Sequence, residues 1–96
     1  MTTLFIINRA VRDELRACCA LLREGDAMLF IEDGVYLLSA PLEGELVQTL
    51  DKYHCFALRD DLVARGISAK IPPQITLAGY PDFVALTLQY ARVVNW

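Results

Sequence analysis

Four short segments of the chain are largely apolar, and segments with a helical pattern separate them. The four segments are 3–8, 27–32, 54–58 and 75–80. A strand that is apolar on both sides must be covered on both faces, as the strands of a parallel sheet are. Strands that alternate with helices along a chain are typical of α/β domains. We therefore predict that residues 1–96 form a single domain, a three-layer α/β/α sandwich with a mainly parallel sheet of four to five strands.

The helices are predicted from their apolar spacing and from residues that start or stop helices. Their predicted ranges are 9–24, 44–53, 59–66 and 81–91. Asn8 and Asp60 are candidate N-caps, because both side chains can accept backbone N–H groups. Gly25 and Gly66 follow two of the helices as stop residues, and Pro81 suits a first helical turn. On the strands, the predicted core residues are Ile6, Leu29, Ile31, Phe56 and Leu77.

The carboxyl ends of the predicted strands meet at one edge of the sheet, where open α/β sheets bind their ligands. The segments at this edge are 8–9, 33–36, 59–60 and 80–82. Glu32 and Asp33 end the second strand, and a catalytic pair of carboxylates is one interpretation. Consecutive residues of an extended segment point to opposite sides, however, and Asp33-Gly34 is a turn dipeptide. We interpret the pair as a turn that ends the strand.

Three cysteines are the candidates for thiol chemistry. Cys18 lies on the apolar side of the first predicted helix and is most simply a buried hydrophobic residue. Cys19 lies at the border of that side, within about 40° of Arg12 and Arg23 on a helical wheel. Nearby positive charge lowers the pKa of a thiol, so Cys19 is the better candidate for a sulfur-carrying group. Cys55 follows a histidine on a strand, where adjacent side chains face opposite ways, so the two do not form a catalytic pair.

Composition argues against several classes of function. The net charge of −3 and the pI of about 4.9 disfavour direct binding of nucleic acid. One histidine and no CxxC motif are too few for a zinc site, and glycine-rich phosphate loops are absent from the sequence. No stretch approaches the roughly 18 apolar residues of a membrane span, and no signal peptide is recognised. We expect a cytoplasmic protein with free thiols and with neither cofactor nor metal, and one that is not catalytic by itself.

The chain is unusually apolar for its length. Hydrophobic residues make up 55% of its 96 residues, and its mean hydropathy is +0.36. Because a small domain buries a limited share of its surface, a partner subunit is expected to cover part of the rest. Aromatic side chains often anchor interfaces; the candidates are Tyr36, Tyr80, Phe83 and Trp96. The segment 90–96 either folds back onto its own domain or packs at a subunit boundary.

Several short segments together carry a resemblance to a known family. They are Glu24-Gly25-Asp26, Asp33-Gly34-Val35, residues 61–66, residues 80–87 and Trp96. In their order, in their spacing and in the total length of the chain, they resemble the TusB/DsrH family. One departure lies in Arg9-Ala10-Val11, where many members have Arg-Ser-Pro.

The resemblance implies a small α/β/α subunit that assembles with two paralogous subunits, TusC/DsrF-like and TusD/DsrE-like, into a heterohexamer. In such complexes the persulfide cysteine belongs to the D/E-type subunit, which passes sulfur to a TusE/DsrC-like carrier. The Tus branch forms 2-thiouridine at the wobble position of tRNA, whereas the Dsr branch serves dissimilatory sulfur oxidation. We expect a non-catalytic subunit of the Tus type. The alternatives are a Dsr-type subunit and a thiol sulfur carrier that uses Cys19 or Cys18, since some DsrH members carry a cysteine corresponding to Cys18.

Overall fold

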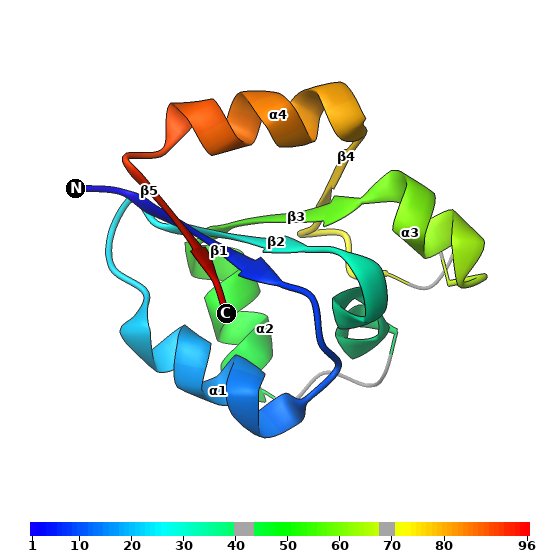
Figure 1. The fold of residues 1–96 in the computed structure, drawn as a ribbon. Coiled ribbons are helices and arrows are strands. Elements are labelled where there is room, and N and C mark those ends of the chain that lie inside the picture. The colour runs from blue at the N-terminus through cyan, green and yellow to red at the C-terminus, as the bar shows by residue number, and fades with distance from the viewer. Residues whose placement is uncertain (40–43, 68–70) are drawn as a thin grey trace.

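A five-stranded parallel sheet forms the centre of the fold. The computed structural model describes residues 1–39, 44–67 and 71–96. The strands are β1 (Thr3–Ile7), β2 (Ala27–Phe30), β3 (His54–Leu58), β4 (Thr76–Ala78) and β5 (Arg92–Asn95). All neighbouring strands pair in parallel, in the order β4-β3-β2-β1-β5 (Figure 1). The predicted α/β sandwich with a parallel sheet is confirmed.

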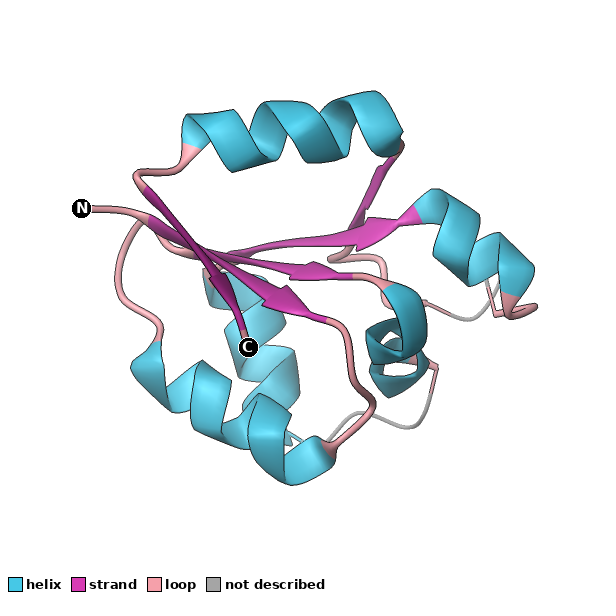
Figure 2. Cartoon of the chain, in the orientation of Figure 1, coloured by secondary structure: helices cyan, strands magenta, loops and turns pink. Residues whose placement is uncertain are grey.

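Helices cover the two faces of this sheet unequally. They are α1 (Arg12–Leu21), the 3-10 helix η1 (Glu32–Leu38), α2 (Gly44–Lys52), α3 (Arg59–Ala64) and α4 (Tyr80–Gln89). On one face lie α1, α2 and η1, and α3 adjoins η1 beyond the end of β3 (Figures 1 and 2). Of the described helices, only α4 crosses the opposite face, where it carries the chain from one edge strand to the other.

The two faces have separate apolar cores because side chains alternate along each strand. Phe5, Ile7, Met28 and Phe30 pack toward α1 and α2, and Leu15, Cys18 and Leu22 complete that cluster from α1 and its end. Leu4, Ile6, Ala27 and Leu29 pack toward α4, together with Leu86. Every residue of β1 and β2 is buried. Burial on both faces explains why these segments are continuously apolar in the sequence.

The core prediction is correct in part. Ile6, Leu29 and Ile31 are buried, and Phe56 is half-buried against the α4 core. Leu77 was wrongly placed in the core, since its side chain is 39% exposed. Because β4 is an edge strand of only three residues, one side of it has no neighbouring strand to help cover Leu77.

The two predicted N-caps, Asn8 and Asp60, are wrong, whereas Pro81 does lie in the first turn of α4. Helix α1 begins after Val11, and Asn8 lies in the connection between β1 and α1 rather than at the cap. Asp60 lies inside the first turn of α3, because β3 leads straight into that helix with Leu58 as the N-cap. No side chain caps either helix. The first helix is shorter than predicted by three residues at each end, 12–21 against 9–24.

The segment 90–96 folds back onto its own domain. It forms β5 in register with β1, so that Leu4 pairs with Val93 and Phe5 pairs with Val94. The Trp96 backbone N–H donates to the Ile6 carbonyl at 2.9 Å. Its indole N–H donates to the Glu14 carbonyl at 2.7 Å, and the ring meets Phe5 edge to face at 5.9 Å between centroids. Thus β5, a strand that the sequence pattern did not identify, forms one edge of the sheet.

Candidate functional site at the carboxyl edge of the sheet

Two helices begin side by side where β2 and β3 end. The 3-10 helix η1 starts at Glu32, with only Ile31 between it and β2, and α3 starts at Arg59, directly after β3. Because the two strands are parallel neighbours, their carboxyl ends bring these helix starts to the same edge of the sheet. This is the edge at which the sequence predicts a ligand-facing surface.

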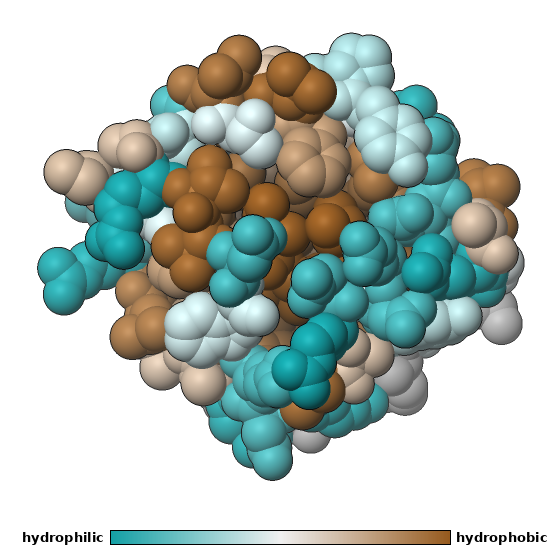
Figure 3. All heavy atoms as spheres, viewed as in Figure 1, coloured by the Kyte–Doolittle hydropathy of each residue, from teal (hydrophilic) through white to brown (hydrophobic). Residues whose placement is uncertain are grey.

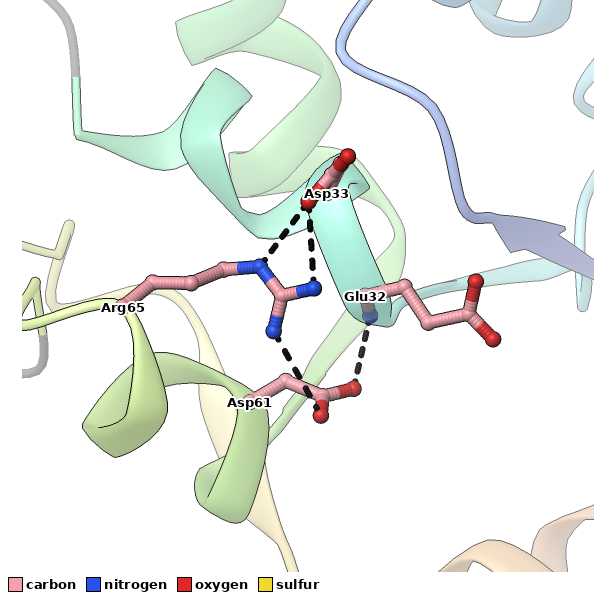
Figure 4. A network of polar contacts seen from close by, with 4 residues as sticks. All are labelled: Glu32, Asp33, Asp61 and Arg65. Atoms are coloured by element: carbon pink, nitrogen blue, oxygen red, sulfur yellow. Dashed lines mark hydrogen bonds and ion pairs between the residues drawn. The ribbon is translucent and has the colours of Figure 1, made fainter.

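A network of charged groups joins η1 to α3 (Figure 4). The Asp61 carboxylate accepts the backbone N–H of Glu32 at 2.6 Å. The Arg65 guanidinium lies 3.1 Å from Asp33 Oδ1 through both Nε and Nη2. Its Nη1 lies 3.7 Å from Asp61 Oδ1, one helical turn away on α3. Arg65 therefore bridges two carboxylates, and Asp61 serves as the cap of a neighbouring helix rather than of its own.

Glu32 and Asp33 do not converge on a common point. Asp33 turns toward Arg65, whereas the Glu32 carboxylate points away from the network (Figure 4). Glu32 has a φ of +50°, in the left-handed region that non-glycine residues seldom adopt. The prediction of a simple turn is wrong in extent, because residues Glu32–Leu38 form a seven-residue 3-10 helix.

Gly34 is required by close packing. A Cβ at this position would lie 2.1 Å from the Ile7 carbonyl oxygen at the end of β1. Positive φ angles occur instead at Glu32, Gly25 and Gly66. The Asp33-Gly34 dipeptide thus reflects a tertiary contact between η1 and β1 as well as local turn chemistry.

The other edge segments make local contacts. Arg9 pairs with Glu14 of α1 at 3.3 Å, and Asp82 accepts the Gly79 backbone N–H at 2.9 Å at the start of α4. Tyr36 belongs to the network region, since the Arg65 guanidinium carbon lies 5.9 Å from its ring centroid. The structure therefore unites the segment 33–36 with α3, but through Asp61 and Arg65, which the sequence analysis did not assign to the edge. In the sequence, the spacing of four residues between Asp61 and Arg65 was the signal that could have indicated an ion pair on one face of the helix.

The thiols differ in accessibility. Cys18 and Cys55 are fully buried in the core beneath α1. Burial, with a further contribution from neighbouring thiols, raises the pKa of each from 9.0 to about 12. Such thiols stay protonated at neutral pH and are poor nucleophiles. Cys19 is half-buried at the margin of the same core, and the adjacent residues His54 and Cys55 lie on opposite sides of β3, one exposed and one buried.

The segment Glu24-Gly25-Asp26 has a structural role at the opposite edge of the sheet. Asp26 is 6% exposed. Its two carboxylate oxygens accept the backbone N–H of Thr3 at 2.8 Å and that of Arg23 at 2.9 Å. Gly25 precedes it with a φ of +89°, a conformation that glycine adopts readily. Together they tie the start of β1 to the turn before β2.

The described residues contain neither a cluster of metal-binding side chains nor a membrane-spanning helix. Within 1–39, 44–67 and 71–96, no group of three or more His, Cys, Asp or Glu side chains is placed to hold a metal ion. Over those same ranges, no helix has the length and apolarity needed to cross a membrane.

Comparisons with known proteins agree with the fold. The family model described as DsrH like protein matches residues 10–93. Protein TusB of Erwinia tasmaniensis is 39% identical over 94 residues, covering 95% of this chain and 96% of the relative. Protein TusB of an Enterobacter species is 33% identical over 85 residues, covering 86% of this chain and 87% of the relative.

Two solved structures share the architecture. A protein of unknown function from Methanobacterium thermoautotrophicum superposes with a TM-score of 0.74 at 16% identity, over 97% of each chain. A protein from Thermotoga maritima gives a TM-score of 0.60 at 21% identity, over 93% of each. At such identities the likeness establishes the fold alone. The family match over 10–93 and the TusB relatives go further, and they show that this chain belongs to the TusB/DsrH family.

Proposed function

We propose that the chain is a non-catalytic subunit of a cytoplasmic sulfurtransferase complex that relays persulfide sulfur toward 2-thiouridine at the tRNA wobble position. Membership of the TusB/DsrH family supports a sulfur-relay role in tRNA modification. The relatives at 33–39% identity carry the name Protein TusB, which favours the Tus branch over a Dsr-type complex of sulfur oxidation. The proposed partners are a TusC-like and a TusD-like subunit, with a TusE-like carrier that receives the sulfur.

The state of the thiols is the observation that most supports a non-catalytic role. A group that accepts sulfur from a persulfide must present a thiolate to the donor. Cys18 and Cys55 are buried and have a pKa raised to about 12. At the carboxyl edge, Arg65 contacts both Asp33 and Asp61. The proposal therefore places the sulfur-carrying cysteine on the TusD-like partner.

A second candidate function is a sulfur carrier that uses Cys19. Its half-buried position makes it more accessible than either of the other two thiols. This candidate differs from the first in a measurable way, because a carrier must acquire sulfur itself.

Reconstitution with the paralogous subunits tests both functions. The complex is incubated with a persulfide donor, and each subunit is weighed intact by mass spectrometry. We expect the mass of one added sulfur atom on the TusD-like subunit and none on this chain. In a strain lacking the gene, the wild-type chain and Cys19→Ser should restore 2-thiouridine in tRNA equally well. An added sulfur on this chain, lost in Cys19→Ser together with tRNA thiolation, would establish the carrier instead.

A further inference from the structure

The helix layer on one face of the sheet is incomplete. Among the described residues, α4 is the only helix on that face, whereas α1, α2 and η1 share the other (Figure 1). Val93 of β5 lies on the α4 side, because it is in register with Leu4, and it remains 41% exposed. An α/β sheet is stable when helices cover both of its faces. Val93 therefore belongs to a part of this face that α4 leaves uncovered.

The outer side of α4 carries an exposed apolar ridge. Tyr80, Val84 and Leu88 are 56%, 59% and 81% exposed, and their spacing of four residues aligns them along the helix. Phe83, Leu86 and Tyr90 face inward and pack on the sheet. The surface view shows brown, apolar atoms gathered over α4 and again below it toward the sheet (Figure 3). We name Tyr80, Val84 and Leu88 the α4 ridge.

Charge restricts what the ridge can bind. Asp82 is the only charged residue in Tyr80–Gln89, and its carboxylate turns back to the Gly79 N–H at 2.9 Å. An uncharged apolar ridge offers nothing to phosphates or to a charged peptide, and it matches a partner surface that is itself apolar. Ridges of residues four apart interdigitate with the same ridges on another helix. The fitting occupant is therefore an apolar helix.

We propose that the α4 ridge is the docking surface for an apolar helix of a paralogous subunit in the sulfur-relay complex. The inference rests on the proposed function, which supplies partner chains of the same fold. A second copy of this chain would bring together two proteins of net charge −3, and this repulsion opposes self-association. The docked helix lies along α4 above β5 and shields the ridge and Val93 from water.

Matched substitutions test the ridge in the co-expressed complex. The ridge variants are Val84→Glu and Leu88→Glu. The controls are Val63→Glu on α3 and Leu21→Glu on α1, whose native side chains are 61% and 51% exposed. A carboxylate buried in an apolar interface loses its hydration without compensation. We expect recovery of the paralogous subunits on the tagged chain to fall at least about tenfold for the ridge variants, as for an interface anchor, and to stay unchanged for the controls.

A labelling experiment gives a result that does not depend on how well the glutamate variants fold. In a Cys19→Ala background, Leu88→Cys should react with a maleimide in the isolated chain and become protected in the complex. Val63→Cys should react in both. Assembly of the ridge variants at wild-type levels, or undiminished labelling of Leu88→Cys in the complex, would overturn the proposal.

The remaining outcomes separate this inference from the proposed function. Protection of Leu88→Cys in the isolated chain, increasing with its concentration, would make a second copy the occupant and refute the choice of a paralogous helix. If the wild-type chain recovers no paralogous subunit at all, the proposed function fails and the inference fails with it. If the wild-type complex forms and only the ridge result is negative, the proposed function stands and the docking surface alone is refuted.

Discussion

Gly34 shows how one missing side chain positions an entire helix. Its backbone approaches the Ile7 carbonyl so closely that an added Cβ would lie 2.1 Å from the oxygen. Neither partner can move cheaply, because both belong to the backbone and Ile7 is also held in β1. The cost of a side chain here is therefore steric, and it applies to alanine as well as to branched residues.

Gly34→Ala should lower the free energy of unfolding by about 1–3 kcal/mol or more, as overpacking does in close-packed interiors. Gly44→Ala is the matched control, because a Cβ at Gly44 would meet no atom of the described residues within 4 Å. That control should be neutral or should stabilise the protein by up to about 1 kcal/mol. Urea unfolding of the three proteins measures both effects. Equal stability of Gly34→Ala and wild type would show that η1 can shift away from β1.

The buried thiols should make stability fall at high pH. In the unfolded chain, Cys18 and Cys55 ionise near pH 9.0, while in the folded protein their pKa is raised to about 12. Above pH 9 the unfolded state binds fewer protons than the folded state, so ionisation favours unfolding. This contribution is fully present below pH 9 and is lost progressively toward pH 12, by up to about 1.4 kcal/mol per pH unit for each thiol.

The double variant Cys18→Ala Cys55→Ala tests this pH dependence. Urea unfolding of the wild type and the variant from pH 8 upward, in the presence of a reductant, should give a shallower decline for the variant. All other ionisable groups are the same in both proteins, so the difference between the two slopes isolates the thiols. Parallel slopes would contradict the assignment of these cysteines to a desolvated core.

Helix η1 depends on a side chain from another element. Its first N–H, from Glu32, is accepted by Asp61 of α3, and Asp61 in turn lies beside Arg65. A cap supplied from a distant segment joins the ends of β2 and β3, so the two helices should lose stability together. This coupling distinguishes the network from an isolated surface ion pair, which contributes little.

Asp61→Ala should cost about 1–2 kcal/mol of unfolding free energy, the range for loss of a helix cap. Its neighbour Asp60 is exposed, and its carboxylate makes no hydrogen bond or ion pair that is seen among the described residues. Asp60→Ala should therefore change stability by less than about 0.5 kcal/mol, as most surface substitutions do. Hydrogen exchange should also show faster opening of η1 in Asp61→Ala. If both variants lost similar amounts of unfolding free energy, the effect would come from removing a negative charge from α3 and not from the lost cap of η1.

At the scale of the whole molecule, β5 forms one edge of the sheet and Trp96 ends it. The indole bonds to the Glu14 carbonyl and contacts Phe5, so it links the last strand to α1 and β1. Trp96 is partly buried, and Tyr36 and Tyr80 are 43% and 56% exposed. These aromatic side chains, like the rest of the α4 ridge, remain accessible for the proposed subunit interface. Phe83 contributes mainly inward, to the core under α4.

Trp96→Ala should lower the stability of the isolated chain by about 2 kcal/mol, somewhat less than for a fully buried aromatic residue. Asn95→Ala is the control, because the Asn95 side chain is exposed on the edge strand. Urea unfolding measures stability, and recovery of paralogous subunits on the tagged chain measures assembly. A Trp96→Ala chain of normal stability that fails to assemble would show that the residue acts at the interface and not in the fold.

Local pattern was sufficient for much of the architecture. The continuously apolar segments around Ile6, Leu29 and Ala57 predicted buried parallel strands, because a strand covered on both faces needs apolar residues at every position. The helices between them followed from periodicity and from glycine and proline at their ends. The resemblance carried by Asp26, Gly34 and the segment 61–66 identified the family, and the structure shows that these residues make contacts on which the fold depends.

The features that the sequence pattern did not predict all depend on contacts between residues that are distant in the chain. The segment 92–95 reads as a tail until β1 offers it a partner, since pairing with a neighbour is what makes a strand. The cap of η1 comes from Asp61, 29 residues away, and the need for glycine at position 34 comes from the Ile7 carbonyl. The exposure of the α4 ridge likewise follows from which side of α4 meets the sheet. Such contacts exist only once the chain has folded, because periodicity reports which residues are to be buried and not which groups they will meet.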